Sequence, residues 1–235
     1  MSSCEKTGHR YQVNTRFAFV MRTLGLGLAG CNKFCGLMDM ASTFLSKSSH
    51  LDLMKSISCS VKTTAEKFLV SAANEETQQT RANSESDTLT VSGDGTWQKQ
   101  GFSSSFGVTS LIGYWSGKVI DIFISSLHCQ ACKLWEKQLN TDEFKEWYQE
   151  HVENNECQAN PTGPSGNMEV NAVIELLRRS EKNYGAKISN YIGDGDSETY
   201  GHLSKAKPYG KNFTINKKNV SATCKKEWVN VYVIL

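Results

Sequence analysis

The chain has 235 residues, of which 39% are hydrophobic and 21% are charged, and its formal net charge is +2 at pH 7. This composition is typical of a soluble globular protein, and so small a charge identifies no partner by itself. The polar N-terminus predicts no secretory signal peptide, and no apolar run approaches the roughly 18 residues that a membrane span needs. We therefore expect a nuclear or cytoplasmic protein that is not secreted and has no membrane partner.

Residues 1–85 differ from the rest of the chain and are expected to form a helical extension and a linker. Apolar residues recur at helical spacing between residues 15 and 40, where several glycines predict two shorter helices or a kink in one. Residues 50–81 carry a more regular helical pattern, and residues 74–87 are polar, as expected of a helix end followed by a linker. Packing is the interpretation we favour for these helices, and docking to a partner or to DNA is the alternative.

Three β-prone runs follow at short intervals, and they predict an antiparallel meander. They are Leu89–Trp97, Ser105–Trp115 and Lys118–Leu127.

Helices and one more strand are predicted downstream of the meander. One helix is expected to begin near Thr141, which can cap it, and a second is expected over Met168–Tyr184. A strand over Lys187–Gly193 and a helix over Glu198–Ala206 complete the pattern. The order is typical of an α/β fold in which helices cover a mixed sheet.

Two acidic clusters lie at the ends of predicted strands. Asp94 stands between two glycines, and Asp194 and Asp196 flank a third. Carboxylates at neighbouring strand ends can hold Mg²⁺ or Mn²⁺, and two such ions about 3.5–4 Å apart can activate a nucleophile for attack on a phosphodiester. The alternative for each aspartate is a turn cap or a solvated side chain, since Asp-Gly is a common turn dipeptide.

A second cluster combines cysteines with histidine. Cys129 and Cys132 form a C-x-x-C pair, and the helix predicted after them would bring His151 and Cys157 back to it. Three cysteines and one histidine make a tetrahedral zinc set, with His128 as a rival ligand. The alternatives are inert thiols or a thioredoxin-like redox pair. In thioredoxin-like proteins, however, C-x-x-C opens a helix after a parallel strand, whereas here it follows the predicted antiparallel meander. We therefore predict one structural Zn²⁺ per chain.

Several motifs occur in order along most of the chain. They are Asn14-Thr-Arg-Phe-Ala-Phe-Val-Met-Arg, Ser92-Gly-Asp-Gly-Thr-Trp-Gln-Lys-Gln-Gly-Phe-Ser-Ser, Ser116-Gly-Lys-Val-Ile-Asp, Cys129-x-x-Cys-x-x-Trp-Glu, Gly163-Pro-Ser-Gly-Asn-Met-Glu, Tyr191-Ile-Gly-Asp-Gly-Asp-Ser and Lys207-Pro-Tyr-Gly. Together they resemble the Mutator-like transposase domain of animal mobile elements, over residues 12–215. The resemblance implies an RNase H-like fold and DDE-type cutting and transfer of DNA strands.

The same resemblance assigns roles to the acidic residues. It implies Asp94 as the first catalytic acid and Asp194 as the second, with Asp196 as the rival, and Asp94 and Asp194 as ligands of Mg²⁺ or Mn²⁺. The implied partner is DNA, as transposon ends and as target, and a homo-oligomer is compatible with this function.

The chain is accordingly divided into three parts. Residues 1–85 form the extension and linker, and residues 86–215 form a partial RNase H-like core with a Cys/His insertion at 128–166. Residues 216–235 form a tail that departs from the family pattern.

The tail is predicted to be out of frame. After Lys207-Pro-Tyr-Gly210 the family continues with ECVGHVQKRMG, whereas this chain has Lys218-Asn-Val-Ser-Ala-Thr-Cys-Lys-Lys-Glu-Trp. The chain can be translated back into its permitted codons, and the third base of each codon can then be read together with the first two bases of the next. Read in this way, the codons restore the family sequence, which predicts a frameshift between Gly210 and Lys218. The third catalytic acid would then lie beyond the printed chain, which we expect to be an incomplete and inactive fragment. The alternative is a zinc-stabilised remnant that binds DNA or protein without catalysis.

Overall fold

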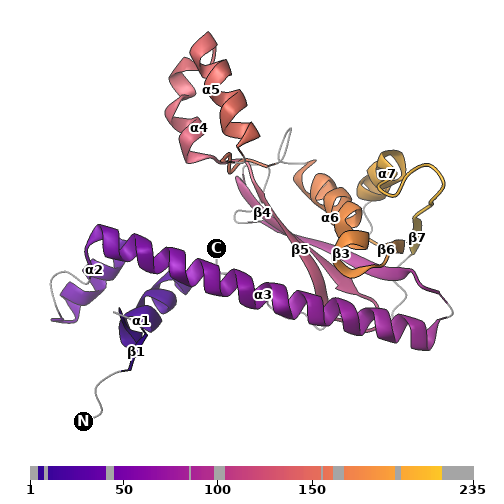
Figure 1. The fold of residues 1–235 in the computed structure, drawn as a ribbon, viewed down its shortest axis with the longest axis horizontal. Helices are drawn as coiled ribbons and strands as arrows, with labels where there is room; N and C mark the ends of the chain where they lie inside the picture. Colours follow the sequence, from indigo (N-terminus) through magenta and orange to yellow (C-terminus); the bar gives the residue numbers. More distant parts are fainter. Residues whose placement is uncertain are drawn as a thin grey trace. The chain divides into compact units, whose positions relative to one another are not determined.

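The computed structural model describes residues 5–7, 10–40, 45–84, 86–97, 104–154, 156–160, 167–193 and 197–218. The chain divides into two compact units, the first ending at Phe68 and the second beginning at Leu69. One helix, α3 (Lys47–Asn83), crosses this boundary (Figure 1). Each unit has a hydrophobic core of its own.

The first unit is helical apart from a short hairpin. β1 (Lys6–Thr7) pairs antiparallel with β2 (Arg10–Tyr11), and α1 (Gln12–Thr23), α2 (Leu28–Leu37) and the first part of α3 follow. The core is small: Ala18 of α1 packs with Leu53 and Ile57 of α3.

Gly25 separates the two shorter helices that the glycines predicted. Its φ is 76°, in the left-handed region that glycine adopts without strain. The N–H of Gly25 donates to the carbonyl of Arg22, and the N–H of Leu26 donates to the carbonyl of Met21. This pair of bonds satisfies the last carbonyls of α1 and confirms the predicted break.

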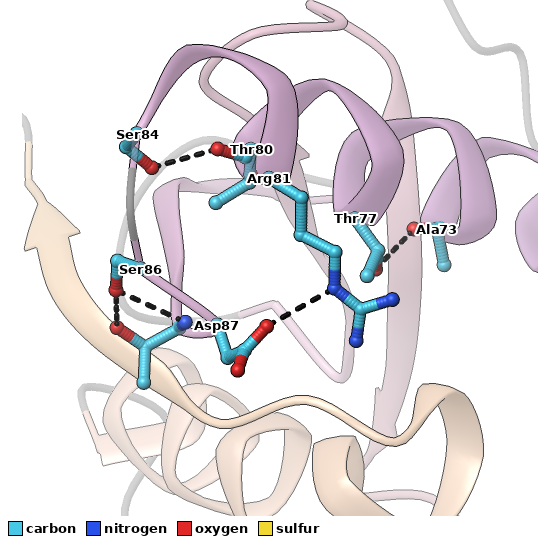
Figure 2. A network of polar contacts seen from close by, with 8 residues as sticks. Ala73, Thr77, Thr80, Arg81, Ser84, Ser86 and Asp87 are labelled. Carbon is cyan, nitrogen blue, oxygen red and sulfur yellow. Dashed lines mark hydrogen bonds and ion pairs between the residues drawn. The ribbon is translucent and has the colours of Figure 1, made fainter.

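α3 has 37 residues and extends beyond the predicted range 50–81 at both ends. Residues 74–83, expected to lead into a linker, are helical because Ala72, Ala73 and Glu76 are buried in the second unit. Figure 2 shows how the helix ends: the Ser84 hydroxyl donates to the Thr80 carbonyl, and Arg81 pairs with Asp87 at 3.1 Å. These contacts turn the chain into the first long strand.

The second unit is built on a mixed sheet of five strands in the order β5-β4-β3-β6-β7. β3 (Leu89–Trp97), β4 (Phe106–Gly113) and β5 (Val119–Ser126) form the predicted antiparallel meander. β6 (Ile188–Ile192) and β7 (Asn216–Lys218) run parallel to β3 on its other side. This is the RNase H-like α/β arrangement expected from the sequence, although β7 was not predicted and lies within residues 216–235.

Helices cover this sheet and extend from it. α6 (Met168–Tyr184), which has the predicted bounds, packs against β4, β5 and α7 (Ser197–Ala206). Gly185 ends α6 with a left-handed φ of 67°. Between β5 and α6 lie α4 (Gln130–Leu134), a short 3-10 helix and α5 (Asp142–Glu153), which form the predicted insertion (Figure 1).

A buried carboxylate joins α3 to the turn between β4 and β5. Glu76 is 0% exposed, and its carboxylate accepts the N–H groups of Trp115 at 3.1 Å and Ser116 at 2.7 Å. Removing it leaves both backbone N–H groups without their acceptor and empties a fully buried position, so Glu76→Ala is expected to destabilise the second unit by about 3 kcal/mol. Urea unfolding measures this loss. The control is Glu75→Ala, whose side chain is 38% exposed in a surface pair with Lys118 and should cost under ~1 kcal/mol. Equal losses in the two variants would contradict the prediction.

Candidate functional site

The structure brings the four predicted zinc ligands together at the base of the insertion. Cys129 directly precedes α4, Cys132 lies on α4, His151 lies in the last turn of α5 and Cys157 follows that helix. Their ligand atoms all lie within 4.8 Å of one another. The Sγ of Cys129 is 3.3 Å from Nε2 of His151, and the Sγ atoms of Cys132 and Cys157 are 3.7 Å apart. The predicted set is thus confirmed as a group that could bind zinc.

The rival ligand His128 does not belong to this group. Its ring lies 6.1 Å from the ring of Phe106, at the end of the sheet. His151 therefore supplies the imidazole of the cluster.

The electrostatics of the thiols differ strongly from one cysteine to the next. Burial raises the pKa of Cys129, but the N–H groups of Cys132 and Gln158 and the His151 ring outweigh it, and the pKa falls to about 6. Burial and the neighbouring thiols of Cys129 and Cys157 raise the pKa of Cys132 to about 12. A thiolate is thus available at Cys129 in neutral solution, and a metal ion must displace the proton of Cys132.

Three residues that the sequence analysis missed hold His151 in place. Oε2 of Glu156 lies 3.6 Å from Nδ1 of His151, on the opposite side of the ring from the cysteines. The Trp147 ring stacks on the imidazole at 4.6 Å, and the Trp135 ring stacks on Trp147 at 5.2 Å. A carboxylate on the outer nitrogen of a ligating histidine fixes its tautomer and orientation. Trp135 stands in the quoted motif Cys129-x-x-Cys-x-x-Trp-Glu, and Trp147 precedes His151 by one helical turn, whereas Glu156 leaves no such signal in the sequence.

Asn160 closes the insertion on the strand from which it leaves. Its side-chain oxygen accepts the N–H of Ser126 at 2.8 Å, and its side-chain nitrogen donates to the carbonyl of Ile124 at 2.6 Å. Both partners belong to the last residues of β5. Asn160 therefore returns to the end of the strand from which the insertion leaves.

Of the predicted catalytic acids, the structure describes Asp94. It is half-buried on β3, paired with Ser110 of β4. Asp194 and Asp196 lie outside the described residues. The strand before them, β6, ends at Ile192, which pairs with Ser92, two residues before Asp94. The sheet thus places the end of β6 beside the acidic segment of β3.

A family model described as Mutator-like transposase matches residues 2–230, nearly the whole chain. The chain belongs to the Mutator-like transposase family. Comparisons with curated proteins and with solved structures find no match. In the part of this transposase domain that the structure describes, no helix is long and apolar enough to cross a membrane. The family match extends past the quoted motifs and through most of the tail, whose predicted frame change stays a prediction.

Glu169 is a second carboxylate in the neighbourhood of Asp94 in this transposase domain. It lies in the first turn of α6, and a Cβ placed on Gly95 would be 3.1 Å from its Cδ and Oε2 atoms. Tyr191 of β6 lies against Gly93 in the same way. Burial raises the pKa of the Tyr191 phenol, and the negative charges of Glu169 and Asp94 raise it further. Spacing along the chain assigns Glu169 no role, because its proximity to Gly95 depends on how α6 crosses the sheet.

The two groups of ligands suit different metals. The carboxylates beside Gly95 offer oxygen, which Mg²⁺ and Mn²⁺ prefer, and the Cys/His cluster offers sulfur and nitrogen, which zinc prefers. The chemistry of the donors therefore fits the divalent cation that the transposase family implies at Asp94.

Proposed function

We propose that this domain performs metal-dependent cleavage and transfer of DNA strands, with Asp94 as a ligand of Mg²⁺ or Mn²⁺. The observation that carries the proposal is the placement of Asp94 on β3, next to the end of β6 that leads to Asp194. In an RNase H-like sheet β3 and β6 are neighbouring strands, so carboxylates far apart in sequence can reach one ion. Membership of the transposase family supplies DNA as the substrate, as transposon ends and target.

Each part of the site has a distinct task in this proposal. When bound, the divalent cation stabilises the charge that develops on a phosphodiester and lowers the pKa of a coordinated water. Asp94 supplies a carboxylate oxygen, and Asp194, with Asp196 as the rival, supplies the second. Cys129, Cys132, His151 and Cys157 hold a structural Zn²⁺ that shapes the insertion and takes no part in the chemistry.

Replacing Asp94 with asparagine tests the proposal. We expect Asp94→Asn to lower Mn²⁺-dependent cleavage of DNA carrying the element's ends by roughly a hundredfold or more, because the amide cannot balance the cation's charge. Gel-based cleavage assays measure this. The control is Asp87→Asn, a surface aspartate two residues before β3 whose side chain is 84% exposed. Equal cleavage by the two variants would sink the assignment of Asp94.

A second candidate function follows from the reading frame. The regrouped codons after Gly210 favour a non-catalytic, zinc-stabilised remnant that binds DNA or protein. Such a remnant binds DNA with a strong dependence on salt concentration yet shows no Mn²⁺-dependent cleavage. Sequencing the transcript across codons 205–235 and beyond tests the frame change: a transcript that reads ECVGHVQKR in frame favours a longer transposase, and a transcript with the printed frame and no such sequence downstream removes the frameshift hypothesis.

A further inference from the structure

We propose that Glu169 is a ligand of the same divalent cation as Asp94, so that α6 contributes one of the carboxylates of the site. The inference rests on the proposed function and assigns a further residue to that site. Neither the sequence pattern nor the family match gives this residue a task.

The approach of Glu169 to β3 depends on a glycine. A Cβ on Gly95 would stand 3.1 Å from Cδ and Oε2 of Glu169, closer than most Cβ contacts in proteins. The missing side chain thus lets the carboxylate lie directly on the strand, one residue from Asp94. Gly93, on the other side of Asp94, similarly admits the ring of Tyr191.

The edge of β3 is where the two carboxylates can meet. Side chains alternate between the faces of a strand, so Asp94 leaves β3 from the face opposite to the one on which Gly95 admits Glu169. On the side of β4, β3 is paired as far as Trp97, so the backbone next to Asp94 is already occupied by β4 on that side. Towards β6 the described pairing ends at Ser92, two residues before Asp94. An ion bound at this second edge would be reached from one face by Asp94 and from the other by Glu169.

Charge supports the same location. Glu169 and Asp94 both act on the buried phenol of Tyr191, whose ionisation they oppose. Two carboxylates that act on the same phenol also repel each other. A divalent cation bound to both would remove this repulsion.

Another role must be distinguished from ligation. An acidic residue in the first turn of a helix interacts favourably with the helix dipole. That role predicts a loss of helix stability in Glu169→Gln and an unchanged affinity for the cation. Metal ligation predicts a loss of affinity.

Mn²⁺ binding decides between the two roles without reference to catalysis. The purified chain is first loaded with zinc to occupy the thiol cluster, and the free Mn²⁺ signal is then followed by electron paramagnetic resonance. We expect Glu169→Gln to weaken Mn²⁺ binding at least tenfold, as Asp94→Asn also does. The matched control is Glu175→Gln on the same helix, whose side chain is 46% exposed and which should bind as the unmodified chain does.

The outcomes separate this inference from the proposed function. If Asp94→Asn loses Mn²⁺ and Glu169→Gln binds it normally, the role of Glu169 is wrong and the proposed site stands. If the unmodified chain binds no Mn²⁺, or Asp94→Asn binds it normally, the proposed site itself fails.

Gly95→Ala keeps both carboxylates and carries the test if Glu169→Gln does not fold. The added methyl group would stand 3.1 Å from the Glu169 carboxylate, which must shift by a few tenths of an ångström away from the strand, so we expect a several-fold loss of Mn²⁺ affinity with unchanged zinc content. Unchanged Mn²⁺ affinity in a folded Gly95→Ala protein would overturn the inference.

Discussion

Cys132→Ser is expected to abolish zinc binding and to unfold the insertion while the sheet stays folded. α4 has five residues and α5 has twelve, and isolated helices of such lengths are marginal in water. Leu134 and Leu139 are 77% and 50% exposed, so the insertion buries little apolar surface of its own. A structural zinc ion contributes about 10–16 kcal/mol of apparent binding free energy to small domains of this kind. We therefore expect zinc binding to decide whether these helices form.

Metal analysis and tryptophan fluorescence measure this effect. The unmodified protein should carry one zinc per chain, and its fluorescence should change on chelation because Trp135 stacks on Trp147 and Trp147 stacks on His151. Cys59→Ser is the control, because this exposed thiol lies on α3 outside the cluster. The prediction is wrong if Cys132→Ser retains one zinc with the same fluorescence.

Repeating the zinc titration at two pH values tests which thiol protons are released when zinc binds. The pKa of Cys132 is raised to about 12 without metal, so this thiol holds its proton at neutral pH and must release it on binding. Protons compete with the metal, and zinc should bind more tightly at pH 8 than at pH 6. At pH 6 the competition also includes Cys129, whose pKa is about 6.

The sequence predicted the long, strongly patterned elements of the second unit. The bounds of β3 and α6 agree with the structure, because apolar periodicity is regular in both and Gly185 marks the end of α6. β7 has three residues and α4 has five, too few for a period to be recognised. α3 ends at Asn83, slightly beyond the predicted Arg81, and burial of Glu76 against the turn between β4 and β5 keeps this polar end helical.

The candidate sites divide in the same way. The zinc ligands were predictable because C-x-x-C spacing and one helix bring four residues together within a short segment. Glu156 was not, since its contact with His151 depends on the turn after α5. Glu169 was not either, because its position over Gly95 is set by the packing of α6 across the sheet. Local spacing is visible in a sequence, whereas the crossing of two elements is not.

Arg179→Met is expected to destabilise the second unit by about 3–5 kcal/mol, because it leaves the carboxylate of Asp121 buried without its partner. Asp121 is 6% exposed on β5. Nε and Nη2 of Arg179 donate to its two oxygens at 3.0 Å and 2.6 Å, and Nη2 also donates to the carbonyl of Ile122. The guanidinium lies 5.7 Å from the Phe123 ring. This ion pair fastens α6 to the edge strand of the sheet.

Arg178→Met is the matched control, one residue earlier on the same helix. Its side chain is 56% exposed and lies 3.9 Å from Glu175, so the loss should stay within about 1 kcal/mol. Urea unfolding of both variants compares the two losses, and similar values would show that the buried pair has no special weight.

The double variant Asp121→Leu/Arg179→Met completes the argument. Replacing both partners of a buried ion pair by apolar residues is often close to neutral, so it should recover much of the stability that Arg179→Met loses.

Asp121 ends the motif that begins at Ser116, and the N–H of Ser116 is bound by Glu76. Both ends of this family motif are therefore explained by contacts that position α3 and α6. If the double variant recovers its stability, the motif serves to stabilise the fold, and the proposed chemistry rests on Asp94 and its neighbours.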